Sequence, residues 1–191
     1  MSNDKKARLR DIIYEEGRLY AERDSVKMRT ILYLLFMHCG FFLDVCYRIA
    51  NALSMRYRNA YLGELLPKII MQFARIITSS SISHKAKIGR RFVIAYGMNI
   101  VIGEYVEIGD DVIVFNGTSF GSTIPGRAEV KQPTIGDRVL IGAGAKVLGG
   151  IRIGNDVRVG ANSVVLQSCP DNVTIAGIPA KIVKGPEKDS R

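Results

Sequence analysis

Aliphatic residues recur at six-residue intervals over the C-terminal part of the chain. The series runs through Ile82, Ile88, Ile94 and Ile100, shifts by two residues to Ile102, Ile108, Val114 and Phe120, and resumes at Ile135, Ile141, Val147, Ile153, Val159 and Val165. Helices repeat their apolar face near 3.6 residues, and two-faced strands alternate with a period of 2. A period of six instead predicts a short flat strand followed by a corner, three of which close one coil of a parallel β-helix.

Each step carries a second position suited to burial four residues after its start, as at Phe92, Val106 and Val139. Glycine often follows the aliphatic residue directly, and glycine, asparagine and aspartate suit tight corners. Successive coils would then pair at about 4.8 Å, the usual spacing between strands. The interruption between two runs of the repeat predicts an extruded loop over 122–134.

The first 80 residues lack this repeat and show helical patterns instead. Apolar positions at helical spacing predict helices over Arg8–Arg23, Phe41–Tyr57 and Tyr61–Ile77. The apolar run Ile31–Leu43 is too short to span a bilayer, so we interpret it as a buried helix. Peripheral membrane contact through this basic region is the minor alternative. The predicted organisation is a helical region over 1–80, a β-helix over 81–185 and a tail over 186–191.

Composition narrows the class of protein only a little. The chain is 47% hydrophobic and 24% charged, as in ordinary globular proteins, and its formal charge of +9 favours polyanionic partners. Nucleic acid is not expected, because no reading motif accompanies the charge. The polar N-terminus is not a signal peptide, and Cys39, Cys46 and Cys169 lack metal-ligand spacing. We therefore expect free thiols, no metal and a cytoplasmic protein.

Three segments of the chain resemble one enzyme family. They read SISHKAKIGRRFVIAYGMNIVIGE, then PTIGDRVLIGAGAKVLGGIRIGNDVRVGANSVVLQSCPDN, then AGIPAKIVKG. These segments are similar to the serine acetyltransferases and to their relatives that O-acetylate colanic acid and other surface polysaccharides. The resemblance implies an all-β, left-handed parallel β-helix with an N-terminal α-helical region. It also implies a homotrimer that binds acetyl-CoA as co-substrate between neighbouring subunits.

The resemblance also implies which positions carry the chemistry, and this chain departs from the family there. The family's catalytic histidine corresponds to Tyr96, its orienting aspartate to Ser81, and a second histidine in the loop to Gln132. A base with a pKa near the working pH is needed to deprotonate a hydroxyl, and tyrosine, with an ordinary pKa of about 10, is a weak one. Standard serine acetylation therefore ranks last among the three functions weighed below.

The repeat arithmetic predicts which side chains stack from coil to coil. Positions two residues after each aliphatic start form three columns if the loop costs no change of face. The columns are Tyr96, Asn116 and Ala143; His84, Glu104 and Ser122; and Arg90, Asp110 and Asp137. The first is the family's active-site column, so Tyr96 and Asn116 are candidate catalytic residues. In the second, Glu104 could orient His84 as a base, against the alternative of a solvated surface pair.

The features implied for cofactor binding are better preserved. Small residues at Gly121, Gly142, Ala143 and Ala161 would let a pantetheine arm approach the backbone, although they also suit tight corners. Lys181 and Lys184 could contact the cofactor's phosphates.

Three functions remain open from the sequence. The first is an acetyl-CoA-dependent O-acyltransferase acting on a sugar or surface-polysaccharide precursor. The second is a catalytically silent homologue that serves as a structural or regulatory subunit. The third is a serine O-acetyltransferase with an altered active site.

Overall fold

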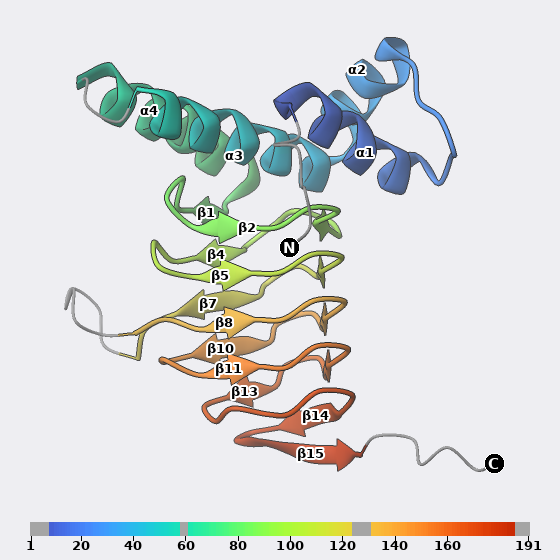
Figure 1. The fold of residues 1–191 in the computed structure, drawn as a ribbon, viewed down its shortest axis with the longest axis vertical. Coiled ribbons are helices and arrows are strands. Elements are labelled where there is room, and N and C mark those ends of the chain that lie inside the picture. The colour runs from blue at the N-terminus through green and yellow to red at the C-terminus, as the bar shows by residue number, and fades with distance from the viewer. Residues whose placement is uncertain (1–7, 58–60, 124–130, 186–191) are drawn as a thin grey trace, which may run out of the picture.

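Helices and strands occupy separate parts of the chain. The computed structural model describes residues 8–57, 61–123 and 131–185. Within these, four helices come first: α1 Leu9–Ala21, α2 Met28–Met37, α3 Cys39–Arg56 and α4 Tyr61–Thr78. The helices lie across one end of a stack of short strands, and the chain descends the stack to β15 at the other end (Figure 1).

The strands form three sheets, one for each side of the coil. The first contains β1 Ser81–Ile82, β4 Val101–Ile102, β7 Ser119–Gly121, β10 Lys146–Leu148 and β13 Val164–Val165. The second contains β2 Lys87–Ile88, β5 Glu107–Ile108, β8 Thr134–Ile135 and β11 Arg152–Ile153. The third contains β3 Val93–Ile94, β6 Ile113–Val114, β9 Leu140–Ile141, β12 Arg158–Val159, β14 Thr174–Gly177 and β15 Ala180–Lys184.

Strand register confirms the predicted parallel coil. Ile82 pairs with Ile102, which pairs with Phe120, so each aliphatic start lies directly over another one coil away. Only the last pair, β14 with β15, is antiparallel among the described strands. The handedness of the coil remains a prediction.

The interruption in the repeat costs no change of face, as the column arithmetic assumes. Phe120 belongs to β7 in the first sheet, and Ile135 pairs with Ile108 in the second sheet, which is the next side of the coil. The loop therefore leaves and rejoins the coil in phase. Most of it, residues 124–130, lies outside the described residues, as does the tail 186–191.

The interior of the β-helix is filled by the aliphatic starts and by the residues four positions later. Side chains such as Ile94, Phe92, Val106 and Ile141 are fully buried.

A further set of side chains lies along one edge of the β-helix and accepts hydrogen bonds from backbone N–H groups of the coil above. Asp110 Oδ1 accepts from Arg90 N at 2.7 Å, Asp137 Oδ1 from Asp110 N at 2.9 Å, and Asn155 Oδ1 from Asp137 N at 2.9 Å. The third predicted column is therefore a backbone-capping ladder.

Three of the predicted helices agree with the structure, and the fourth does not. The run Ile31–Leu43 is divided at His38 into α2 and α3, which meet at 110°. Leu32, Tyr33 and Phe36 on α2 are exposed, so the interpretation as one buried helix was wrong. Because apolar residues occur on all sides of this helix, the sequence pattern does not indicate which side is exposed. His38, at the junction of the two helices, is exposed as well.

The described helices are short or only partly apolar compared with a membrane-spanning helix. No single one of them is long and apolar enough to cross a bilayer, and the bent pair α2 and α3 meets the criteria of length and composition only when taken together. Peripheral membrane contact stays a prediction.

The helices cap the top of the β-helix with polar side chains. A terminal strand leaves backbone groups without a strand partner, and such groups need other partners when they are buried. Arg48 on α3 donates to Ile88 O at 2.8 Å and to Gly89 O at 2.6 Å. Tyr47 donates to Ala86 O at 2.7 Å. The cap therefore stabilises the first coil through hydrogen bonds as well as apolar contact.

Candidate functional site

One edge of the β-helix carries the candidate catalytic and cofactor residues together. Ile94 pairs with Val114, Val114 with Ile141, and Ile141 with Val159. The residues two positions later are Tyr96, Asn116, Ala143 and Ala161, which therefore stack one coil apart. We call this line of residues, between the third and first sheets, the Tyr96 edge. The predicted column of Tyr96, Asn116 and Ala143 is confirmed.

The corner that carries Tyr96 is larger than the corners below it. Eight positions separate Ile94 from Ile102 in the next strand, whereas six separate Val114 from Phe120 and Ile141 from Val147. Tyr96 and Gly97 both have left-handed backbone conformations, with φ of 69° and 64°. The Tyr96 side chain is 69% exposed, and its ring lies 6.4 Å from that of Phe115. Tyr96 thus projects from an enlarged corner beside a second aromatic ring.

Below Tyr96, the edge is formed by small residues at which successive coils pack closely. A Cβ at Gly142 would lie 2.6 Å from Ala161 N, so only glycine fits there without a shift. Gly144, in the left-handed region with φ of 74°, faces Asn162 closely enough that a Cβ would lie 2.1 Å from the amide oxygen. The small residues Ala143 and Ala161 continue this surface. Small side chains at these positions leave room for a narrow, extended ligand to approach the edge.

The two candidate phosphate-binding lysines lie at opposite ends of β15. Lys181 is paired with Ala176, next to Gly177, which follows Ala161 down the Tyr96 edge. Lys184 is paired with Thr174 and lines a hollow of about 520 Å³ with Asp156, Arg158 and Asn172. Lys181 therefore lies toward the small-residue strip, whereas Lys184 lies toward the ladder edge.

Gly121 and Gln132 lie away from that strip. Gly121 ends β7, and a Cβ there would meet no atom within 4 Å. Gln132 Oε1 accepts a hydrogen bond from Tyr105 N at 3.1 Å. The Gln132 side chain therefore closes the turn at Gly103–Tyr105, on the edge between the first and second sheets. Within one chain, Gln132 and Tyr96 are on different edges.

His84 also occupies this second edge, and its surroundings differ from both sequence interpretations. Its side chain is buried, 7% exposed, and Nε2 is buried without a hydrogen-bond partner in the described part of the chain. Burial and the nearby Lys85 charge lower the pKa of His84. The expectation of a solvated surface pair was wrong for His84, whose side chain is buried where Asn51 on α3 donates a hydrogen bond to His84 O at 2.8 Å.

Glu104 lies in register with His84 but pairs with a different cation. Its carboxylate is 3.2 Å from Lys85 Nζ, and Lys85 also lies 4.0 Å from Glu64 on α4. Lys85 follows His84 directly, its side chain is longer than that of histidine, and it carries a full positive charge. Glu104 therefore forms its ion pair with Lys85. A groove of about 920 Å³ passes this cluster and is lined by Tyr47, Asn51, Glu64, His84 and Lys85 among others.

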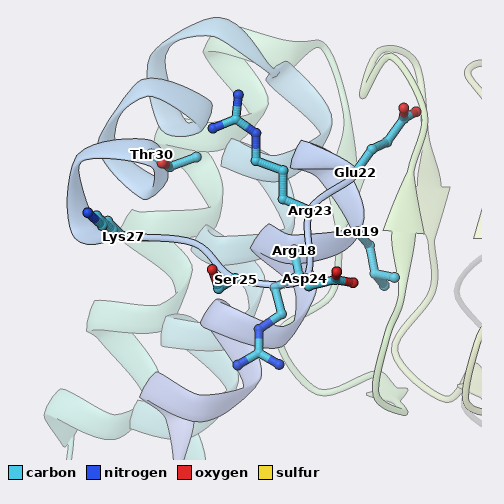
Figure 2. Close-up of a pocket in the computed structure, with 8 residues that line it drawn as sticks. All are labelled: Arg18, Leu19, Glu22, Arg23, Asp24, Ser25, Lys27 and Thr30. Carbon is cyan, nitrogen blue, oxygen red and sulfur yellow. The ribbon is translucent and has the colours of Figure 1, made fainter.

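A second hollow, of about 1150 Å³, opens at the connection between α1 and α2 (Figure 2). Its lining is mostly charged and polar: Arg18, Leu19, Glu22, Arg23, Asp24, Ser25, Lys27 and Thr30. Figure 2 shows Arg18 and Arg23 extending in different directions and Glu22 pointing outward. These side chains do not converge on a common point, so we place the candidate site at the Tyr96 edge.

Comparison with known proteins agrees with this fold. The family described as bacterial transferase hexapeptide (six repeats) matches residues 132–167. A serine acetyltransferase of Helicobacter pylori strain J99 is 42% identical over 174 residues, which cover 91% of this chain and 96% of that protein. The chain therefore belongs to the serine acetyltransferase family.

Solved structures of this family superpose closely on the chain. The serine acetyltransferase of Neisseria gonorrhoeae aligns with a TM-score of 0.80 and 27% identity, over 94% of this chain and 68% of that one. A serine acetyltransferase of Brucella abortus, solved in complex with coenzyme A, aligns with a TM-score of 0.78 and 28% identity, over 92% and 67% of the two chains.

Sequence reasoning missed two features of this serine acetyltransferase family member. It did not identify Phe115, on the coil below, as the ring beside Tyr96, or the enlargement of the corner that projects Tyr96. The two-residue shift between Ile100 and Ile102 was the available signal for the enlargement. No group of three or more potential metal ligands occurs among the described residues.

Proposed function

We propose that this chain transfers an acetyl group from acetyl-CoA to a hydroxyl group at the Tyr96 edge. The observation that carries the proposal is the alignment of Tyr96 and Asn116 with the small-residue strip at Ala143 and Ala161 along one edge. The reaction forms an ester bond at the acceptor oxygen, breaks the thioester C–S bond and moves one proton from the hydroxyl to the departing sulfur. Positioning the two substrates along one edge supplies part of the rate.

Acetyl-CoA is the proposed acetyl donor. A family member of similar structure was solved with coenzyme A, and the strip below Tyr96 suits its pantetheine arm. When bound, the thioester supplies the activated acyl group. The role of this chain's residues is to hold the extended arm against the Tyr96 edge, with Lys181 near its phosphates.

Serine is the acceptor that the relatives favour, since the similar proteins are serine acetyltransferases. The sugar or polysaccharide acceptor ranked first from the sequence finds no support among them. It remains the second candidate for one reason, which is that the exposed Tyr96 ring lies beside the half-buried ring of Phe115. Aromatic rings present large apolar faces to a ligand, which suits a ring-shaped acceptor better than a small zwitterion. A silent subunit is the weakest of the alternatives.

A homotrimer is the assembly that we propose. The face of α4 that carries Leu62, Ile69, Phe73 and Ile76 is exposed in the single chain. Apolar patches of this kind often mark contacts between proteins. A trimer would also let the His84 and Gln132 edge of one chain approach the Tyr96 edge of its neighbour. Sedimentation analysis at micromolar concentration is expected to find three chains, and a monomer would contradict the shared site.

The acceptor and the base can be separated in one set of assays. Purified protein is incubated with acetyl-CoA and either serine or sugar acceptors, and release of free thiol is followed. We expect serine-dependent release, a loss of about 100-fold in Tyr96→Phe, and a gain in Tyr96→His, because general-base catalysis is worth about that much. A comparable loss in His84→Ala alone would move the base to the second edge. Absence of release with every acceptor and variant would end the enzyme proposal.

Charge removal at the two lysines gives a matched test of the cofactor site. Lys181→Ala is expected to weaken coenzyme A binding by roughly threefold to tenfold, because one exposed phosphate contact contributes about 1 kcal/mol. Lys184→Ala removes the same charge from the other end of β15 and is expected to change the dissociation constant by less than about twofold. Calorimetric titration measures both constants. Equal effects of the two variants would indicate general charge attraction instead of a defined site.

A further inference from the structure

The enlarged corner at Tyr96 needs support from outside the β-helix. A residue other than glycine in the left-handed region costs roughly 1–2 kcal/mol and persists only where its surroundings fix it. Tyr96 is in this region, whereas Asn116, Ala143 and Ala161, which hold the same place in the coils below, are not among the described residues with positive φ. Tyr96 is also in the top coil, where the third sheet ends at β3 and no further strand covers it.

The C-terminal turn of α1 supplies that support. Tyr20 Oη accepts a hydrogen bond from Ile94 N at 2.6 Å and donates one to Ile94 O at 3.2 Å. These two backbone groups point away from the coil below, since the neighbouring Val93 and Ala95 donate to Val112 O and Val114 O of that coil. The phenol therefore occupies the position of a missing strand, two residues before Tyr96.

The other side of the corner is held by a buried serine. Ser80 Oγ accepts a hydrogen bond from Ile100 N at 3.1 Å and lies 3.1 Å from Gly97 O, to which it can donate. Ser80 is fully buried. One hydroxyl thus joins the beginning and the end of the enlarged turn. Tyr20 and Ser80 together constrain the backbone on both sides of Tyr96.

The Tyr20 ring is itself fixed by packing. It lies edge-on to Phe41 on α3, with ring centroids 5.2 Å apart, and the backbone of α3 at Gly40 lies against Ile94 O. The position of the phenol oxygen is therefore set by the helical cap. Nothing in this arrangement brings Tyr20 itself to the exposed surface of the corner.

We propose that Tyr20 is a positioning residue for the acetyl transfer, holding Ile94 so that Tyr96 faces the acceptor. The helical region then has a role in the reaction in addition to closing the top of the β-helix. This inference rests on the proposed function and concerns the same site. Tyr20 acts through the backbone of β3 and contacts neither the acceptor nor the acetyl donor.

The test compares two phenols that make similar hydrogen bonds from the cap to the first coil. Tyr20→Phe removes the hydroxyl and keeps the ring on Phe41. Tyr47→Phe removes a donor to Ala86 O on the way to β2, remote from the Tyr96 corner. Both variants are expected to lose similar stability. Only Tyr20→Phe is expected to lower kcat, by about tenfold, with coenzyme A affinity unchanged within about twofold, the size expected for one misaligned hydrogen-bonded contact.

Amide hydrogen exchange over residues 93–100 gives a readout that does not require activity. Tyr20→Phe should accelerate exchange in this segment, whereas Tyr47→Phe should not. Wild-type activity with an unchanged kcat in Tyr20→Phe would overturn the positioning role and leave the proposed function intact. An exchange difference without activity in any variant would overturn the proposed function, and with it the catalytic meaning of the contact. Equal losses of kcat in both phenylalanine variants would show a general effect of the cap and would also overturn the inference.

Discussion

Gly40→Ala is expected to cost roughly 3 kcal/mol or more of folding free energy, as substitutions that force backbone apart do. A Cβ at Gly40 would lie 1.8 Å from Ile94 O and 2.9 Å from the Ile94 carbonyl carbon. Both atoms belong to the backbone of β3, so no side-chain rotation can relieve the overlap. The start of α3 would have to move away from the β-helix.

That movement would break several contacts together. Gly97 also faces α3, and a Cβ there would lie 2.4 Å from Gly40 N, so the two backbones fit against each other at glycine on both sides. Tyr20 reaches Ile94 only while α3 and β3 keep this distance. Gly40→Ala should therefore lower both the melting temperature and the protection of residues 93–100 against exchange.

Gly121→Ala is the matched control, because a Cβ at Gly121 would meet no atom within 4 Å. Its effect on unfolding free energy is expected to stay within about 0.5 kcal/mol, the usual range for surface substitutions. Chemical denaturation of the three proteins measures the difference. Equal stability of Gly40→Ala and wild type would mean that α3 is not seated on β3 as described.

The sequence predicted the β-helix well because its information is local and repeated. A six-residue period with two buried positions defines the strand, the corner and the face of every coil, and the columns follow by arithmetic. The assumption that the interruption at 122–134 changes no face was correct, because the six-residue repeat before it and the one after it place their aliphatic residues on successive sides of the same coil. The bounds of α1, α3 and α4 followed from one-sided apolar patterns in the same way.

Contacts between the cap and the β-helix could not be predicted. The close approach of Gly40 to Ile94 joins residues 54 positions apart, as their numbers show, and neither local pattern reveals the other. The column of His84 indicated neither the burial of its side chain nor the hydrogen bond from Asn51 on α3 to its carbonyl. Strand register placed Glu104 beside His84, but register does not describe how far a side chain extends. The longer Lys85 side chain therefore forms the ion pair with Glu104.

The unfolding free energy is expected to fall as pH rises from about 5 to 9, because two buried carboxyl groups of the cap lie beside a single buried guanidinium. Arg48 Nη2 lies 2.5 Å from Glu16 Oε1, and Arg48 Nε lies 3.4 Å from Asp44 Oδ1. Glu16 and Asp44 are fully buried, and Glu16 Oε2 and both Asp44 oxygens lack hydrogen-bond partners in the described part of the chain. Two carboxylates thus share one guanidinium.

Burial, followed by repulsion from Asp44, raises the pKa of Glu16 from 4.5 to about 9, and burial raises the pKa of Asp44 as well. In the unfolded chain Glu16 loses its proton near its ordinary pKa, whereas the folded chain keeps that proton up to about pH 9. The folded state therefore binds more protons than the unfolded state between these values. Stability must decrease across the window by about 1.4 kcal/mol per pH unit for each retained proton.

Glu16→Gln tests this assignment, because the amide keeps the shape of the protonated acid and cannot ionise. Its stability is expected to depend much less on pH between 5 and 9, and at pH 9 it should exceed that of wild type. Glu22→Gln, at an exposed glutamate of the same helical region, should retain the wild-type slope. Urea unfolding at several pH values measures the slopes, and a wild-type stability that rises from pH 5 to 9 would contradict proton retention.

Arg48 also donates hydrogen bonds to the carbonyls of Ile88 and Gly89. Arg48→Met should therefore be less stable than wild type at every pH, by roughly 3–5 kcal/mol for a broken buried pair.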